Sequence, residues 1–223
     1  MPQQAPRVAT TPRRRGLTAF ALDSAEWKLI MPGMRVMPLF ASLLLVLPAA
    51  VRATDQTIEL GGGKAVILNL PEGWKLTSGD GSGATTMDAQ IVQLTPDNGA
   101  NAAGLIRVEL APDEHFADHT ALREALQTTI EPLIPGSVEK KAGFREFKSP
   151  HGFGYAVTFT DPTLVGKPPE SGNYKTETFL LLALSDQVVV RATLLADDLK
   201  GPEYESMLAM IRSLAVRKKS DRI

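Results

Sequence analysis

Two apolar runs in the last quarter of the sequence place the strongest constraint on the fold. Residues 180–184 read LLLAL and residues 188–190 read VVV, with Ser185 and Asp186 between them. Such a short polar step between two apolar runs indicates a tight β-hairpin. Because successive side chains of a strand point to opposite faces, strands that are apolar at every position must be covered on both faces. The chain therefore has to supply covering elements for both sides of a sheet.

Two amphipathic helices are predicted that could provide this cover. In the first, apolar residues recur at spacings of three and four from Leu122 to Leu133, with Asp118 as a candidate N-cap and a Pro-Gly pair as the end signal. The second begins at Pro202, with acidic residues in its first turn, and its apolar stripe runs from Tyr204 to Ala215.

Short alternating runs predict the remaining strands. For the run at 105–110 the apolar residues do not alternate perfectly, so its facing stays open. We predict an α+β fold: a largely antiparallel sheet covered by helices on both faces, an α/β/α sandwich, formed by residues 54–223 as a single domain. The strands are expected near 58–60, 65–70, 74–76, 89–94, 105–110, 138–147, 153–160, 174–184 and 187–195.

Three features resemble the PsbP-like family of α/β/α sandwiches. The sequence LPEGW at 70–74 is similar to the P-x-G-W turn near the start of that fold. The hairpin at 178–195, followed by a helix that ends in MIRSL at 210–214, is similar to its ending. The order of elements resembles the family over most of 56–216. The resemblance implies a non-catalytic accessory or binding module, and it supplies no catalytic residues.

The first 53 residues have the composition of a leader. In residues 34–53, a short positive start precedes the apolar block PLFASLLLVLP, and small residues stand at Val51 and Ala53. This order is typical of a secretory signal peptide, so we expect cleavage after Ala53 and a periplasmic or secreted product. Residues 1–33 are expected to be a disordered, over-long start. A retained membrane anchor is the alternative, although the apolar stretch of about fifteen residues falls short of the roughly twenty that span a bilayer.

The remaining chain is acidic. Seven of the 24 basic residues and only two of the 25 acidic residues lie in 1–53, which leaves 17 basic and 23 acidic residues in 54–223. This balance does not favour nucleic acids or anionic membrane surfaces as partners. The chain has no cysteine, which excludes disulfides, thiolate metal sites and a cysteine nucleophile. No cofactor motif is found, because the Gly61–Lys64 segment lacks the P-loop spacing.

One cluster of residues is typical of metal ligands. His115 and His119 are four residues apart, so on a helix they would share a face and could hold a divalent cation together with Asp113. Two features weigh against such a site. Pro112 and the cap at Asp118 place His115 before the helix, and no glutamate of the H-E-x-x-H kind is present.

The predicted function is that of a periplasmic or secreted, non-catalytic accessory or binding protein. Its partner would be an envelope protein or a small ligand, and no stable membrane span is expected after signal cleavage. Two alternatives stay open. One is a metal-assisted hydrolase that uses His115 and His119. The other is a carrier of a small apolar ligand, with a pocket between the second helix and Trp74.

Overall fold

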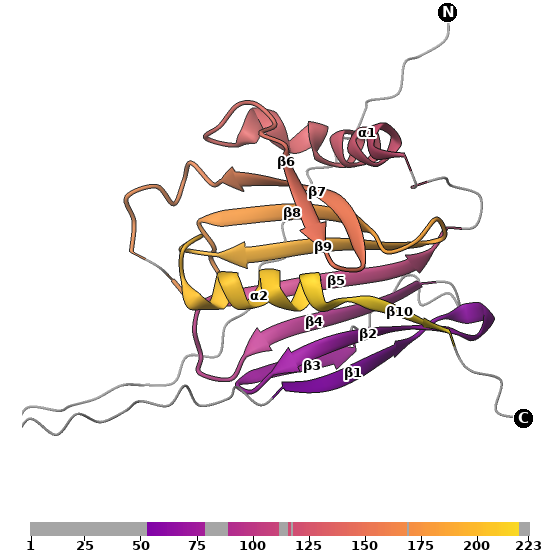
Figure 1. The fold of residues 1–223 in the computed structure, drawn as a ribbon. Helices are drawn as coiled ribbons and strands as arrows, with labels where there is room; N and C mark the ends of the chain where they lie inside the picture. Colours follow the sequence, from indigo (N-terminus) through magenta and orange to yellow (C-terminus); the bar gives the residue numbers. More distant parts are fainter. Residues whose placement is uncertain (1–52, 79–88, 112–115, 117, 169, 219–223) are drawn as a thin grey trace, which may run out of the picture. The chain divides into compact units, whose positions relative to one another are not determined.

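The computed structural model describes residues 53–78, 89–111, 116, 118–168 and 170–218. The predicted leader, apart from Ala53, lies outside these ranges. Within them the chain forms two antiparallel sheets and two α-helices, which confirms the α+β class (Figure 1). None of the helices in these ranges combines the length and the apolar character needed to cross a bilayer.

A seven-stranded sheet forms the centre of the fold, with strand order β3-β4-β5-β9-β8-β7-β6 and every neighbouring pair antiparallel. A three-stranded sheet has the order β1-β2-β10. Helix α1 spans His119–Ile130 and α2 spans Pro202–Ser213, while short 3-10 turns occupy Gly61–Gly63 and Glu131–Gly136. The strands are β1 Ala53–Glu59, β2 Lys64–Pro71, β3 Trp74–Ser78, β4 Ala89–Pro96, β5 Ala102–Leu110, β6 Arg145–Ser149, β7 Gly152–Thr160, β8 Thr176–Ala183, β9 Val188–Ala196 and β10 Ala215–Lys218.

The predicted hairpin is β8 and β9, and both are interior strands of the large sheet. Ser185 stabilises the turn, because its hydroxyl accepts hydrogen bonds from the backbone N–H groups of Gln187 and Val188 at 3.2 and 3.1 Å. The side chains of Leu180 and Leu182 belong to one buried cluster, and that of Leu181 belongs to another. The two apolar runs of the hairpin, 180–183 and 188–190, are therefore buried on both faces, as the sequence predicts.

Helix α2 and the small sheet pack on one face of the large sheet, called here the α2 face. Met207, Met210 and Ile211 of α2 are almost fully buried there together with Val66 and Leu68 of β2. The one buried hydroxyl of α2 also has a partner, because the Tyr204 OH lies 2.9 Å from Thr178 Oγ1, which in turn lies 2.8 Å from Thr158 Oγ1. Apolar contact and paired polar groups thus complete this core.

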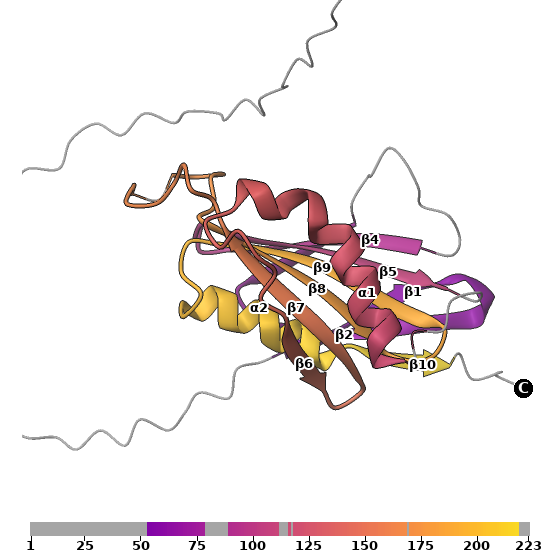
Figure 2. The ribbon, with the colours of Figure 1, turned by 90° about the horizontal axis from the view of Figure 1, so that it is seen from above.

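Helix α1 packs on the opposite face, called here the α1 face, against β7 and β8 (Figure 2). Leu122, Leu126 and Ile130 form its buried stripe. One helix packs on each face, but the cover of both faces that the sequence predicts is not shown. A helix is about 10 Å wide and strands lie about 4.8 Å apart, so one helix covers about two strands. Within the described ranges no element covers the α1 face over β5, and Leu105 is 49% exposed.

Two further segments differ from the sequence prediction. The strand expected at 138–147 is reduced to β6, because Glu139 instead accepts hydrogen bonds from the Thr160 N–H at 2.9 Å and the Thr160 hydroxyl at 2.7 Å. Burial acts to raise the pKa of Glu139, but these bonds hold it below its ordinary value. The second helix ends at Ser213, and Ala215, which the sequence assigns to the apolar stripe of the helix, is the first residue of β10. This strand was not predicted, because its first residue continues the helical spacing.

Candidate functional site

The open part of the α1 face contains a pocket of about 220 Å³ between α1 and β5, with β8 and β9 as its floor. We call it the α1 groove. Most of its surface is apolar, and its polar groups are two threonines and two arginines. The side chains that line it from the α1 face are those of Leu105, Arg107, Leu126, Thr129, Phe179, Leu181, Arg191 and Thr193.

The register of β5 with β9 places these residues. Ile106 and Val108 of β5 are fully buried in the cluster of the α2 face. The alternation of a strand therefore directs Leu105 and Arg107 to the α1 face. Leu105 pairs with Thr193 of β9, and Arg107 pairs with Arg191. Leu105 makes the pattern of this strand ambiguous in the sequence, because an exposed leucine looks like a core residue.

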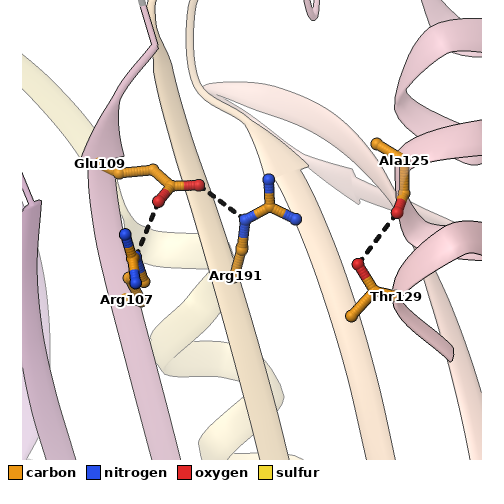
Figure 3. A network of polar contacts seen from close by, with 5 residues as sticks. All are labelled: Arg107, Glu109, Ala125, Thr129 and Arg191. Atoms are coloured by element: carbon orange, nitrogen blue, oxygen red, sulfur yellow. Dashed lines mark hydrogen bonds and ion pairs between the residues drawn. The ribbon is translucent and has the colours of Figure 1, made fainter. Parts of the chain in front are cut away.

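A network of three charged side chains lies at one side of the α1 groove (Figure 3), and two of them, Arg107 and Arg191, belong to its lining. Glu109 accepts a hydrogen bond from Arg191 Nε at 2.6 Å with one carboxylate oxygen and from Arg107 Nε at 2.7 Å with the other. The Glu109 side chain is only 15% exposed, whereas Arg191 is 35% and Arg107 is 42% exposed. Like charges that face each other across two strands repel, so the carboxylate between them stabilises the pair.

The wall that α1 contributes is formed by Leu126 and Thr129. The Thr129 hydroxyl donates a hydrogen bond to the Ala125 carbonyl at 3.0 Å, so it is already satisfied within the helix. On the sheet, Phe179 is half-buried, and its ring lies 6.2 Å from that of Phe159. A ligand would therefore meet apolar surface on two sides of the α1 groove.

One further carboxylate lies on the same face of β8. Glu177 is two residues before Phe179, so both side chains point to the α1 face. Burial raises the pKa of Glu177 above its ordinary value. Glu177 is not part of the groove lining, but it is a second acidic side chain on this face besides Glu109.

The predicted metal cluster is only partly described. Asp113 and His115 lie outside the described residues, so the metal site stays a prediction. His119 is the first residue of α1, and its ring stacks on that of Phe153 with the centroids 3.8 Å apart. Asp118 is the N-cap, as predicted, and accepts from the Thr120 N–H at 2.8 Å. Among the described residues, no group of three or more potential ligands is placed to hold a metal ion.

The sequence predicts a pocket between the second helix and Trp74, whereas the mostly apolar pocket described above lies elsewhere. Trp74 is partly buried and packs against the cluster of the α2 face. The α1 groove lies on the opposite face, beside the first helix. Sequence reasoning missed it because its two walls, α1 and β5, come together only through the register of the sheet.

A second hollow, of about 240 Å³, lies where β5 begins and β9 ends. Two of its polar side chains, Asn101 and Asp197, are already engaged in hydrogen bonds. Asn101 Nδ2 donates to Asp197 Oδ2 at 2.7 Å, and the Lys175 N–H donates to the other oxygen of Asp197 at 3.0 Å. Asn101 also bonds to the backbone of Glu170 and Asn173. These contacts fasten the β7–β8 connection, which is a structural role.

No family model and no curated protein matches this chain. The solved structures that are similar to it include the following two. The Ran-binding protein Mog1p of Saccharomyces cerevisiae is 13% identical, with a TM-score of 0.41, and the match covers 75% of this chain and 97% of that one. Cyanobacterial PsbP (CyanoP) of Synechocystis sp. is 12% identical, with a TM-score of 0.42, and the match covers 76% and 96%.

The weak resemblance to the PsbP-like family, predicted from the sequence, is thus found again among solved structures. Likeness at this level bears on neither the α1 groove nor the function of this chain. The functional reading therefore depends on the groove itself.

Proposed function

We propose that this chain is an exported, non-catalytic binding protein that holds a small, mainly apolar ligand in the α1 groove. The observation that supports the proposal is the groove itself, a concave and mostly apolar surface over strands that are buried on their opposite face. Small-molecule sites are of this kind: apolar walls with a few polar groups placed among them. Its size, about 220 Å³, fits a ligand smaller than most drug molecules.

The lining of the α1 groove supports binding rather than catalysis. Its described residues are leucine, phenylalanine, alanine, threonine and arginine, and none of them is a histidine, carboxylate or lysine that could act as a general base. Neither Thr129 nor Thr193 therefore has a base beside it within the lining, and nucleophilic catalysis requires such a pair. We infer a site that retains its ligand unchanged.

Export is the second part of the proposal and depends on the leader at 34–53. Strand β1 begins at Ala53, so cleavage after this residue removes only the first residue of the strand. Mass spectrometry of the protein from its native cells should find a mature N-terminus at Thr54 in the periplasmic or secreted fraction. A soluble cytosolic product that retains residues 34–53 would contradict export.

A matched pair of variants tests the binding site. Thr128 and Thr129 are neighbours on α1, both are exposed, and each hydroxyl bonds at 3.0 Å to the carbonyl four residues earlier. Only Thr129 lines the α1 groove. Thr129→Trp should fill the groove, whereas Thr128→Trp makes the same change in side chain outside it.

The measurement is fluorescence titration of the full chain with N-phenyl-1-naphthylamine, a neutral apolar probe. We expect Thr129→Trp to weaken binding about tenfold or more, and Thr128→Trp to leave it within about twofold, because a bulky ring in the groove occupies the space of the ligand. Equal binding by the two variants would contradict the proposed site, and so would a wild-type chain that does not bind the probe.

A further inference from the structure

The arginines of the α1 groove form an anion-binding arrangement that the Glu109 carboxylate does not saturate. Arg107 and Arg191 are directly paired across β5 and β9, and one carboxylate serves both. Two guanidinium groups and one carboxylate carry a net charge of about +1, because arginine stays protonated in proteins. This excess lies beside a mostly apolar pocket.

The geometry leaves the terminal nitrogens of both arginines available. Each guanidinium donates to Glu109 through Nε. Within the described part of the chain, the terminal nitrogens of Arg107 and Arg191 make no hydrogen bond to protein. Figure 3 shows the terminal nitrogens of Arg191 on the side of the guanidinium away from Glu109, where Thr129 of α1 lies. Two adjacent N–H donors in a plane match the two oxygens of a carboxylate.

No other acidic residue on the floor of the groove offsets this charge. Arg191 pairs with Leu181 of β8, and Glu177 lies four residues farther along that strand. At about 3.3 Å per residue, the two side chains are separated by roughly 13 Å along the strand direction. This exceeds the Debye length of about 8 Å at physiological ionic strength, so Glu177 does not neutralise the pair.

We propose that the ligand of the α1 groove is a small apolar carboxylic acid in its ionised form. Its carboxylate binds the terminal nitrogens of Arg191 and Arg107, and its apolar body lies against Leu105, Leu126 and Phe179. This inference rests on the proposed function, since it names the class of ligand for the same site. Glu109 binds the two guanidinium groups through their Nε atoms and leaves their terminal nitrogens to the ligand, while its negative charge competes with that of the ligand.

The test compares two ligands with the same alkyl chain, decanoate and 1-decanol, as competitors for N-phenyl-1-naphthylamine on the full chain. Decanol is the more apolar of the two, so a purely apolar groove prefers it or binds both alike. We expect decanoate to displace the probe at a concentration about tenfold lower than decanol, the advantage that a charge-assisted hydrogen bond confers.

Two variants locate the preference. In Arg191→Gln, the ratio of the decanol and decanoate concentrations that displace the probe should fall from about ten to about one, while the probe still binds. Arg145→Gln removes the same charge from an exposed residue of β6, outside the groove, and should keep the ratio. Glu109→Gln removes the competing carboxylate and should increase decanoate affinity by about threefold or more. If the ion pairs of Glu109 had only a structural role, Glu109→Gln would not increase decanoate affinity. This variant therefore tests the inference even if Arg191→Gln does not fold.

The outcomes separate the two proposals. If the probe binds and Thr129→Trp blocks it, but decanol competes as well as decanoate, the groove is a neutral apolar site and the inference about the carboxylate is overturned. A preference for decanoate that survives in Arg191→Gln overturns it as well. If the probe does not bind the wild-type chain at all, the proposed function itself fails.

Discussion

The two faces of the seven-stranded sheet are built from the same strands but are covered to different extents. On the α2 face, a helix and a three-stranded sheet bury side chains from six neighbouring strands, β4 to β6 in the order of the sheet. On the α1 face, one helix of twelve residues packs on β7 and β8. Alternate residues of β5 show the contrast: Ile106 is fully buried, whereas Leu105 is 49% exposed.

Under the proposed function, this difference separates the residues that stabilise the fold from the residues that bind the ligand. The covered face contains the larger buried cluster, with Leu182, Leu194 and Met207 at 0% exposure. The partly covered face keeps surface that a ligand can reach, and it contains the ion pairs of Glu109 with Arg107 and Arg191. Exposed or partly exposed ion pairs contribute little to stability, so their side chains can serve binding without loss of the fold.

The largest contrast is expected from two leucine truncations. Leu194 of β9 is fully buried on the α2 face, and Leu105 of the neighbouring β5 is half exposed on the α1 face. Leu194→Ala should lower the free energy of unfolding by about 3 kcal/mol, because it leaves a cavity. Leu105→Ala should lower it by about 0.5 kcal/mol. Urea unfolding measures both, and equal losses would mean that the α1 face is covered in solution.

A smaller contrast is expected between two threonines. Thr178 is buried on the α2 face and contacts the hydroxyls of Thr158 and Tyr204, whereas Thr193 lines the α1 groove. Thr178→Val should cost about 1 to 2 kcal/mol, since it leaves the buried Tyr204 hydroxyl without that partner. Thr193→Val should change stability by less than about 0.5 kcal/mol. Thermal unfolding of the two variants measures both losses, and equal losses would show that the hydroxyl contacts of Thr178 do not stabilise the covered face.

The smallest effect concerns Glu177 on the α1 face. Burial raises its pKa, so the folded state binds the proton more tightly than the unfolded state does. Stability from this group therefore falls as the pH rises through the raised pKa, and the penalty is absent well below the ordinary value of 4.5. Glu177→Gln should stabilise the protein at pH 7, by less than Thr178→Val destabilises it.

That gain should disappear in acid. Unfolding of Glu177→Gln and the wild-type chain is compared at pH 7 and at pH values below 4.5, with Glu72→Gln in the exposed turn before β3 as the control for one lost negative charge. A gain that is the same at both pH values would show that burial of the carboxylate is not its cause.

The parts of the fold that were predictable have local signals. The β8–β9 hairpin follows from its apolar runs and Ser185, and α1 starts at the residue after Asp118, the predicted N-cap. Pro202 marks the start of α2. In each case the side chains that determine the element lie within a few residues of it.

The α1 groove was not predictable, because its parts are distant in the sequence. Arg107 and Arg191 meet only when β5 pairs with β9, and the partial cover depends on where α1 lies on the sheet. β10 was missed for a related reason: Leu214 and Ala215 continue the helical spacing of α2, and only the available edge of β2 makes residues 215–218 a strand.

The small sheet also links the two ends of the described chain. β2 pairs with β1 on one side, close in sequence, and with β10 on the other, where Ile67 meets Ala215. During synthesis the second edge of β2 therefore stays open until residues 215–218 emerge. An unpaired edge is a template for other strands, so a nascent or truncated chain without β10 is the form most exposed to aggregation, and β10 closes that edge.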